Sequence, residues 1–177
     1  MLPTLRVGDV VLVDELSYRL HSPRAGDVAV FYPPVPSGGD AFIKRVIGVP
    51  GDSLHISDGS LIVNGLPRAE PYEAEPPRYN LRIAEYDIIV DGIRLDPSSA
   101  NIPPASAWKA SDRIPQGYYL MLGDNRNESD DSHVWGFAQF HGIYSAGPLA
   151  GTAHASFVGR ALAVVWPLSH FHLLPTK

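Results

Sequence analysis

Lys44 is a cation inside an apolar run, residues 41–47, and it is one of only three lysines in the chain. Burial lowers the pKa of a lysine, because the charged form loses most on leaving water. An amine that is neutral near pH 7 can accept a proton from a serine hydroxyl, so Lys44 is a candidate general base. A structural interpretation is also open, in which Lys44 is a charge that protects an exposed sheet edge.

Short apolar runs separated by turn residues predict the elements that position Lys44. The chain contains 16 glycines and 17 prolines, which favours many brief strands over long helices. The predicted strands include residues 10–13, 28–31, 41–47, 118–122 and 157–166. Hairpins are expected at residues 55–63 and 86–95, because each contains an Asp-Gly pair that tolerates positive φ. Side chains alternate along a strand, so Lys44 and Arg45 point to opposite faces and one of them faces inward or lies at an edge.

The polar loop at residues 123–136 is the second dense group of functional side chains. Counted from Asp124, an EF-hand calcium loop would need Asp or Asn at the third position, Gly at the sixth and Glu at the twelfth. The chain has Arg126, Ser129 and Trp135 at these positions, which excludes a calcium loop of this type. The interpretation of residues 123–136 as a solvated acidic loop is still possible, although Arg126 and Trp135 favour internal pairing and packing.

Composition argues against several classes of function. The net charge is −5 and there is no basic cluster, so a nucleic-acid partner is not expected. The absence of cysteine rules out disulfides and thiol chemistry. The late apolar run at residues 161–168 is less than half of the roughly 20 residues that cross a bilayer, and no targeting segment is visible. His170 and His172 lack a third ligand, so neither a metal nor a cofactor is expected.

Several stretches of the chain resemble, in order and spacing, the sequence boxes of bacterial type I signal peptidases. Residues 123–136 resemble the box G-D-N-R-x-x-S-x-D-S-R-x-W-G, and residues 42–52 resemble the family's lysine box. Residues 1–9 resemble the segment just after the family's nucleophile, residues 26–31 resemble the next box, and residues 159–167 fit the closing segment. Ordered similarity over nearly the whole chain identifies it as a member of this family.

The resemblance implies a serine endopeptidase that removes signal peptides from exported preproteins, with a serine nucleophile and a neutral lysine base. Lys44 matches the general base, and Ser129 matches the serine whose hydroxyl orients the lysine amine. Met1, Phe42 and Ile43 match positions that line the substrate pockets, and narrow pockets would select Ala-x-Ala before the cut. Structural support of the site is expected from Asp124, Asn125, Arg126 and Asp131.

The chain departs from the family pattern at two places. In the family, the nucleophilic serine immediately precedes the residue equivalent to Met1, and it contributes to the oxyanion hole; a membrane anchor lies further upstream. We therefore expect the chain as printed to lack its nucleophile and its anchor and to be inactive. His133 stands where the family has arginine, so a pairing with Asp131 should weaken as the pH rises and the imidazole loses its charge.

Two other interpretations stay open. Self-cleaving repressor-type proteases share Ser-Lys chemistry and a β-rich core, but this chain lacks their N-terminal DNA-binding helices and carries a middle insertion. A chain with the pockets and Lys44 but without the serine could also be a non-catalytic remnant that holds signal peptides.

The expected architecture is mainly β, with two packed antiparallel sheets and an inserted β-rich cap. We expect a catalytic core domain from residues 1–52 and 115–177, and a cap domain from residues 53–114. By resemblance, the core lies at the cytoplasmic membrane on its extracytoplasmic side. The expected partners are the signal peptides of exported preproteins and the membrane surface.

Overall fold

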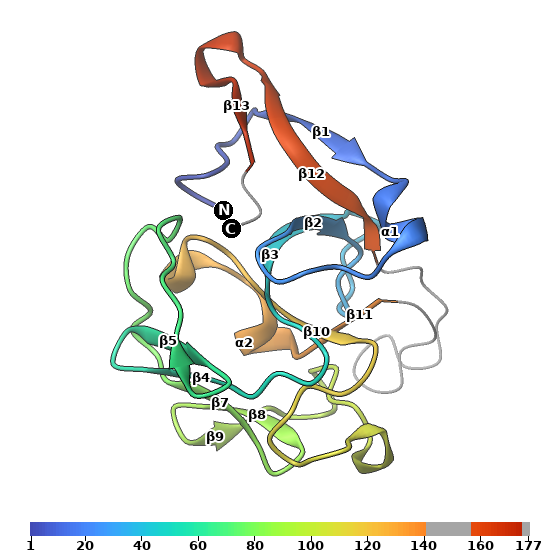
Figure 1. Ribbon diagram of the computed structural model, residues 1–177, viewed down its shortest axis with the longest axis vertical. Helices are drawn as coiled ribbons and strands as arrows, with labels where there is room; N and C mark the ends of the chain where they lie inside the picture. The colour runs from blue at the N-terminus through green and yellow to red at the C-terminus, as the bar shows by residue number, and fades with distance from the viewer. Residues whose placement is uncertain (141–156, 175–177) are drawn as a thin grey trace.

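The computed structural model describes residues 1–140 and 157–174, and Figure 1 shows their arrangement. The strands in these residues are β1 (Val10–Asp14), β2 (Val28–Phe31), β3 (Phe42–Gly48), β4 (Leu54–Ser57), β5 (Ser60–Val63), β6 (Leu66–Pro67), β7 (Leu81–Ala84), β8 (Asp87–Val90), β9 (Ile93–Arg94), β10 (Tyr118–Leu122), β11 (Ala138–Gln139), β12 (Phe157–Trp166) and β13 (His172–Leu173). The helices are all short: α1 (Ser17–Leu20), η1 (Ala105–Ala107), η2 (Arg126–Glu128), α2 (Ser132–Trp135) and η3 (Leu168–His170).

The larger of two sheets is antiparallel and carries Lys44. Its strand order is β1-β12-β2-β3-β10-β11, and β13 pairs with β12. Strand β3 pairs with β2 over Phe42 to Arg45, whereas its pairing with β10 begins only at Arg45. Among the described residues, the first half of β3 therefore has a strand on one side only, and Lys44 lies in this half.

The smaller sheet is built from hairpins and has the order β6-β5-β4-β7-β8-β9. Asp58 and Gly59 join β4 to β5 with φ angles of 49° and 74°, and Asp91 and Gly92 join β8 to β9 with 48° and 82°. Both residues of such a two-residue turn need positive φ, which the Asp-Gly pair tolerates. The two hairpins predicted from the sequence are confirmed.

Strand β10 of the larger sheet packs against the smaller sheet. Leu120 and Leu122 are fully buried and share a hydrophobic cluster with Ile56 and Ile88 of the smaller sheet. Met121 points to the other face of β10, where it belongs to a second cluster. The prediction of a mainly β fold with two packed antiparallel sheets is confirmed.

The strands of the smaller sheet lie between Leu54 and Arg94, inside the range expected for the cap. The hydrophobic cluster that they form also contains Ile47 and Leu120 of the larger sheet, so packing is continuous across the expected boundary. The division into a core domain and a cap domain stays a prediction. Residues 141–156 and 175–177 of the expected core lie outside the described residues.

Strands β1, β12 and β13 form one end of the molecule, and the β4–β9 sheet forms the opposite end (Figure 1). Within residues 1–140 and 157–174, no helix is long and apolar enough to cross a membrane.

Candidate active site

The Lys44 amine lies beside the Ser129 hydroxyl, between the open half of β3 and the loop that follows η2. Lys44 Nζ donates a hydrogen bond of 2.7 Å to Ser129 Oγ. Burial lowers the pKa of Lys44, and the nearby carboxylates of Asp131 and Asp130 oppose this shift. The structure thus brings together the two residues predicted as base and orienting group, although they are 85 positions apart in the chain.

Arg45, the cation next to Lys44, is fully buried on the other side of β3. Its Nε and Nη2 atoms donate to the two carboxylate oxygens of Asp124 at 2.8 and 2.7 Å, and both side chains are fully buried. Arg45 Nη1 also donates to the carbonyl of Gly26 at 3.0 Å. Thr4 donates its hydroxyl proton to Asp124 as well. The inward-facing cation is therefore Arg45, and its bidentate pair fixes β3 to the start of the loop.

The buried carboxylate of Asp131 binds other parts of the loop through hydrogen bonds. Its Oδ2 accepts a 2.8 Å hydrogen bond from the Gly123 amide, and its Oδ1 lies 2.7 Å from Nδ1 of His133. Gly123 has no room for a side chain, because a Cβ atom there would overlap the side chain of Ser129. The side chains of Asp124, Arg126 and Asp131 are fully buried, so a solvated acidic loop is the wrong interpretation for them.

His133 pairs with Asp131 and also stacks on Tyr79, with ring centroids 4.6 Å apart and an interplanar angle of 10°. The contact expected from the sequence is present. The weakening of this contact with rising pH stays a prediction.

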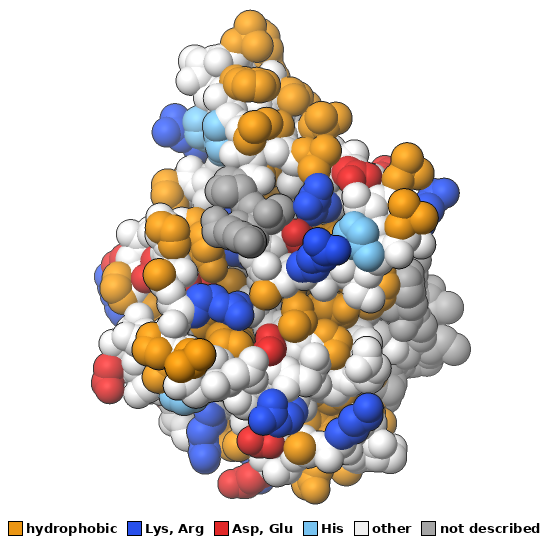
Figure 2. All heavy atoms as spheres, in the orientation of Figure 1, with side chains coloured by type: hydrophobic (Ala, Val, Ile, Leu, Met, Phe, Trp, Pro, Cys, Tyr) orange, Lys and Arg blue, Asp and Glu red, His pale blue; other side chains and the backbone are white. Residues whose placement is uncertain are grey.

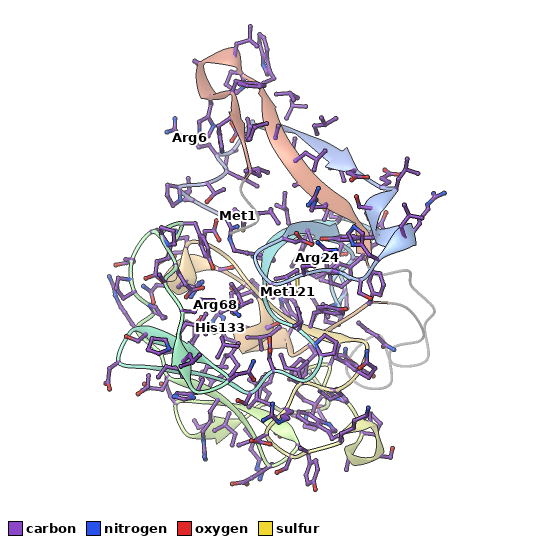
Figure 3. All side chains as sticks on the ribbon, viewed as in Figure 1. Met1, Arg6, Arg24, Arg68, Met121 and His133 are labelled. Atoms are coloured by element: carbon purple, nitrogen blue, oxygen red, sulfur yellow. The ribbon has the colours of Figure 1, made fainter. Side chains whose placement is uncertain are left out.

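A cleft of about 600 Å³ opens next to Lys44. Its lining includes the three residues predicted to bind substrate, and it continues over apolar and charged neighbours: Met1, Leu2, Leu5, Arg6, Val7, Ala41, Phe42, Ile43, Lys44, Asn125, Glu128 and Asp130. The Phe42 ring centroid lies 5.8 Å from Lys44 Nζ. Figure 3 shows Met1 near the middle of the molecule, between the end formed by β12 and β13 and the region of His133. Of the four predicted support residues, Asn125 lines this cleft, whereas Asp124, Arg126 and Asp131 are buried.

The partner of Arg126 was missed in the sequence. Arg126 Nη1 and Nη2 donate to the two carboxylate oxygens of Glu70 at 2.7 and 2.6 Å, and Arg126 Nε donates to the Gly123 carbonyl at 3.1 Å. Glu70 belongs to a segment rich in proline and glutamate that gave no motif. The sequence offered one signal, the arginine at position 126 of the loop. If this arginine is buried, its charge needs a carboxylate partner.

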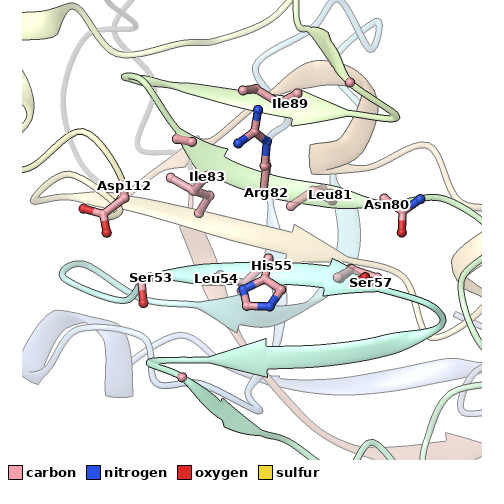
Figure 4. Close-up of a pocket in the computed structure, with 14 residues that line it drawn as sticks. Ser53, Leu54, His55, Ser57, Asn80, Leu81, Arg82, Ile83, Ile89 and Asp112 are labelled. Carbon is pink, nitrogen blue, oxygen red and sulfur yellow. The ribbon is translucent and has the colours of Figure 1, made fainter.

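A second hollow of about 540 Å³ lies on the smaller sheet, and nothing in the sequence predicted it. Figure 4 shows His55 and Arg82, which are paired in register on β4 and β7, among its lining residues. It shares no lining residue with the Lys44 cleft. Among the residues that the structure describes, no group of three His, Cys, Asp or Glu side chains could hold a metal ion.

Fold and site together define a mainly β protein with a lysine-serine contact at the edge of an open cleft. Comparison with known families matches residues 1–166 to "Signal peptidase, peptidase S26". The chain is 34% identical to Signal peptidase I of Leptolyngbya laminosa over 175 residues, covering 96% of the chain and 66% of that relative. The chain belongs to the signal peptidase family, peptidase S26.

Two other curated relatives agree. Identity is 41% over 143 residues with Probable signal peptidase I-1 of Synechocystis sp. (77% of the chain and 59% of the relative). The identity with Signal peptidase IB of Staphylococcus aureus is 34% over 169 residues, covering 96% of the chain and 74% of that relative. A solved structure of signal peptidase I from Enterococcus faecalis has a TM-score of 0.49 at 25% identity, covering 79% of this chain and 97% of that one. The chain spans 66%, 59% and 62% of the length of the first three curated relatives.

Proposed function

We propose that this chain is the peptidase portion of a signal peptidase I, a serine endopeptidase that cuts signal peptides from exported preproteins after Ala-x-Ala. The observation that carries the proposal is the 2.7 Å contact between Lys44 Nζ and Ser129 Oγ at the edge of an open cleft. Burial lowers the pKa of Lys44, which favours the neutral amine that a base requires. The Ser129 hydroxyl holds this amine in place.

The proposed nucleophile is a serine joined to the amide nitrogen of Met1. Two features support this position. Met1 lines the same cleft as Lys44, and the pKa of its amino group is lowered first by burial and then by the Lys44 cation. A residue attached to this nitrogen would therefore lie within the electrostatic reach of Lys44.

In the proposed reaction, the serine oxygen bonds to the scissile carbonyl carbon while its proton passes to the Lys44 amine. The protonated amine then gives this proton to the leaving amino group as the peptide bond breaks, which leaves an ester between serine and signal peptide. Water attacks the ester, and Lys44 transfers a proton from water to the serine oxygen. The cycle ends with free serine, a neutral lysine and two peptide products.

The open edge of β3 offers a place for the substrate backbone. Residues 42–44 pair with β2 on one side, and no described strand pairs with them on the other. An extended peptide can add to such an edge through main-chain hydrogen bonds, with its side chains entering pockets alternately. Phe42 and Ile43 of this edge line the cleft together with Met1, and the preference for small side chains is proposed to come from these three residues.

We also propose that the end formed by β1, β12 and β13 rests on the cytoplasmic membrane, at its extracytoplasmic face. Large apolar side chains are exposed there, and Figure 2 shows apolar groups gathered at this end: Val10, Leu12, Trp166, Leu168, Phe171 and Leu173. Exposed apolar patches of this kind mark interaction surfaces, and tryptophan favours the boundary between lipid and water.

A cleavage assay with two matched proteins tests the proposal. In both, the chain is extended upstream of Met1, with serine directly before Met1 in one and alanine in the other. We expect the serine form to cut a preprotein carrying Ala-x-Ala, and to spare the same preprotein with leucine replacing the last alanine. The alanine form and residues 1–177 alone should not cut.

Two results would contradict the proposal. Cleavage by residues 1–177 alone would place the nucleophile elsewhere. A folded serine form that binds the signal peptide without cutting it would support the non-catalytic interpretation instead.

A further inference from the structure

Residues 70–74, which we call the strap, belong to the insertion but lie against the loop of the active site. Glu70 forms the bidentate pair with Arg126, and the side chains are 4% and 0% exposed. The Ala74 amide donates to the Asp124 carbonyl at 2.9 Å. The strap is therefore bonded to the loop through both a buried charge pair and the main chain.

Tyr72, in the middle of the strap, links the two buried arginines. Its ring centroid lies 3.8 Å from the guanidinium carbon of Arg45, a cation–π contact. Its hydroxyl donates to Glu70 Oε1 at 2.9 Å. Burial raises the pKa of Tyr72, so the hydroxyl stays a donor. The strap thus contacts the residue next to Lys44 on β3 as well as the arginine of the loop.

The path from the strap to the Lys44 amine is short. Glu70 accepts hydrogen bonds from Arg126, and Arg126 Nε donates to the Gly123 carbonyl. Gly123 is packed so closely against Ser129 that no Cβ atom fits between them. A displacement of Gly123 would therefore move the hydroxyl that accepts the hydrogen bond from Lys44.

We propose that Glu70 is a positioning residue that acts through Arg126 to keep Ser129 against the Lys44 amine. Its relevance to catalysis rests on the proposed function. Removing the carboxylate charge leaves Arg126 buried, and within the part of the chain that the structure describes its remaining ionic partner is Glu73, 3.6 Å away. A poorly compensated buried charge is strongly unfavourable. Arg126 then moves toward water, the loop loosens, and the Lys44 amine becomes more exposed to water.

The test is Glu70→Gln, read out by NMR titration of lysine side chains labelled with ¹³C. The chain has only three lysines, and the signal that disappears in Lys44→Arg assigns Lys44. Burial is the leading cause of the low pKa of Lys44, so loosening should shift its titration midpoint to higher pH. Glu70→Asp should give a smaller shift. Glu75→Gln is the matched control, because Glu75 pairs with Arg78 on the exposed surface and should leave the midpoint unchanged.

A folded Glu70→Gln protein whose midpoint is unchanged would show that Glu70 is merely structural, even if the free energy of unfolding falls. A midpoint at lower pH would show that Arg126 acts on Lys44 through its charge alone. Either result overturns the proposal.

If Glu70→Gln does not fold, Glu70→Asp replaces it, because it keeps the charge but shortens the side chain that reaches Arg126. It should shift the midpoint in the same direction, and no shift would overturn the proposal. The titration needs no cleavage, so a failure of the proposed peptidase function would be seen separately.

Discussion

Replacing Lys44 by alanine in the serine-bearing extended protein should reduce kcat/KM for an Ala-x-Ala preprotein on the order of 10⁴-fold. The reason is that the serine hydroxyl is a weak nucleophile unless a base accepts its proton, and Lys44 is the amine in the cleft. The measurement is steady-state cleavage by the two proteins, with circular dichroism to compare their folds.

Lys109→Ala is the matched control, because Lys109 is an exposed lysine in the insertion and should leave kcat/KM unchanged. The buried pair between Arg45 and Asp124 does not involve Lys44, so the Lys44→Ala protein should fold. A Lys44→Ala protein that keeps kcat/KM within tenfold of the parent would show that another group is the base.

Asp124→Asn should lower the free energy of unfolding by about 3–5 kcal/mol. The amide cannot neutralise Arg45, which is fully buried and donates two charge-assisted hydrogen bonds to this carboxylate. Urea unfolding of residues 1–177 measures the effect. Glu85→Gln, which weakens the exposed pair with Arg94, should change the same quantity by only about 0–1 kcal/mol.

A double variant separates the cost of the unpaired charge from the loss of the pair itself. Arg45→Met with Asp124→Leu removes both charges and fills the space with apolar groups, so it should be less destabilising than Asp124→Asn alone. If Asp124→Asn costs less than about 1 kcal/mol, the buried pair is not what holds β3 to the loop.

The strands and turns could be predicted because their signals are local. The turns at Asp58-Gly59 and Asp91-Gly92 depend on two residues each, and the structure has both. Pairing between distant residues gives no such local signal. The sequence left open whether Lys44 lies at a sheet edge. Among the described residues, β3 has a strand on one side only beside Lys44, and this depends on where β10 enters the sheet.

The family boxes predicted which residues meet around Lys44, but they gave no information on the contacts that the insertion makes. Lys44 and Ser129 were placed together by the boxes that contain them. Glu70 and Tyr72 lie in the insertion, outside the boxes. Thr4 lies within the box at residues 1–9, but an uncharged threonine gave no signal of its hydrogen bond to Asp124. A buried arginine predicts that some carboxylate must approach it, but 56 residues separate Arg126 from Glu70 and several nearer acids competed for that role.

The pH dependence of kcat/KM for the serine-bearing protein tests the central claim most directly, because this quantity reports the pKa of the free enzyme's base. Below its pKa the Lys44 amine holds a proton and cannot accept one, so activity should rise with pH. Burial lowers this pKa, so the midpoint of the rise should fall below 10.5, the usual value for lysine, and coincide with the NMR titration of Lys44. Activity that stays constant across the range in which Lys44 titrates would contradict Lys44 as the base.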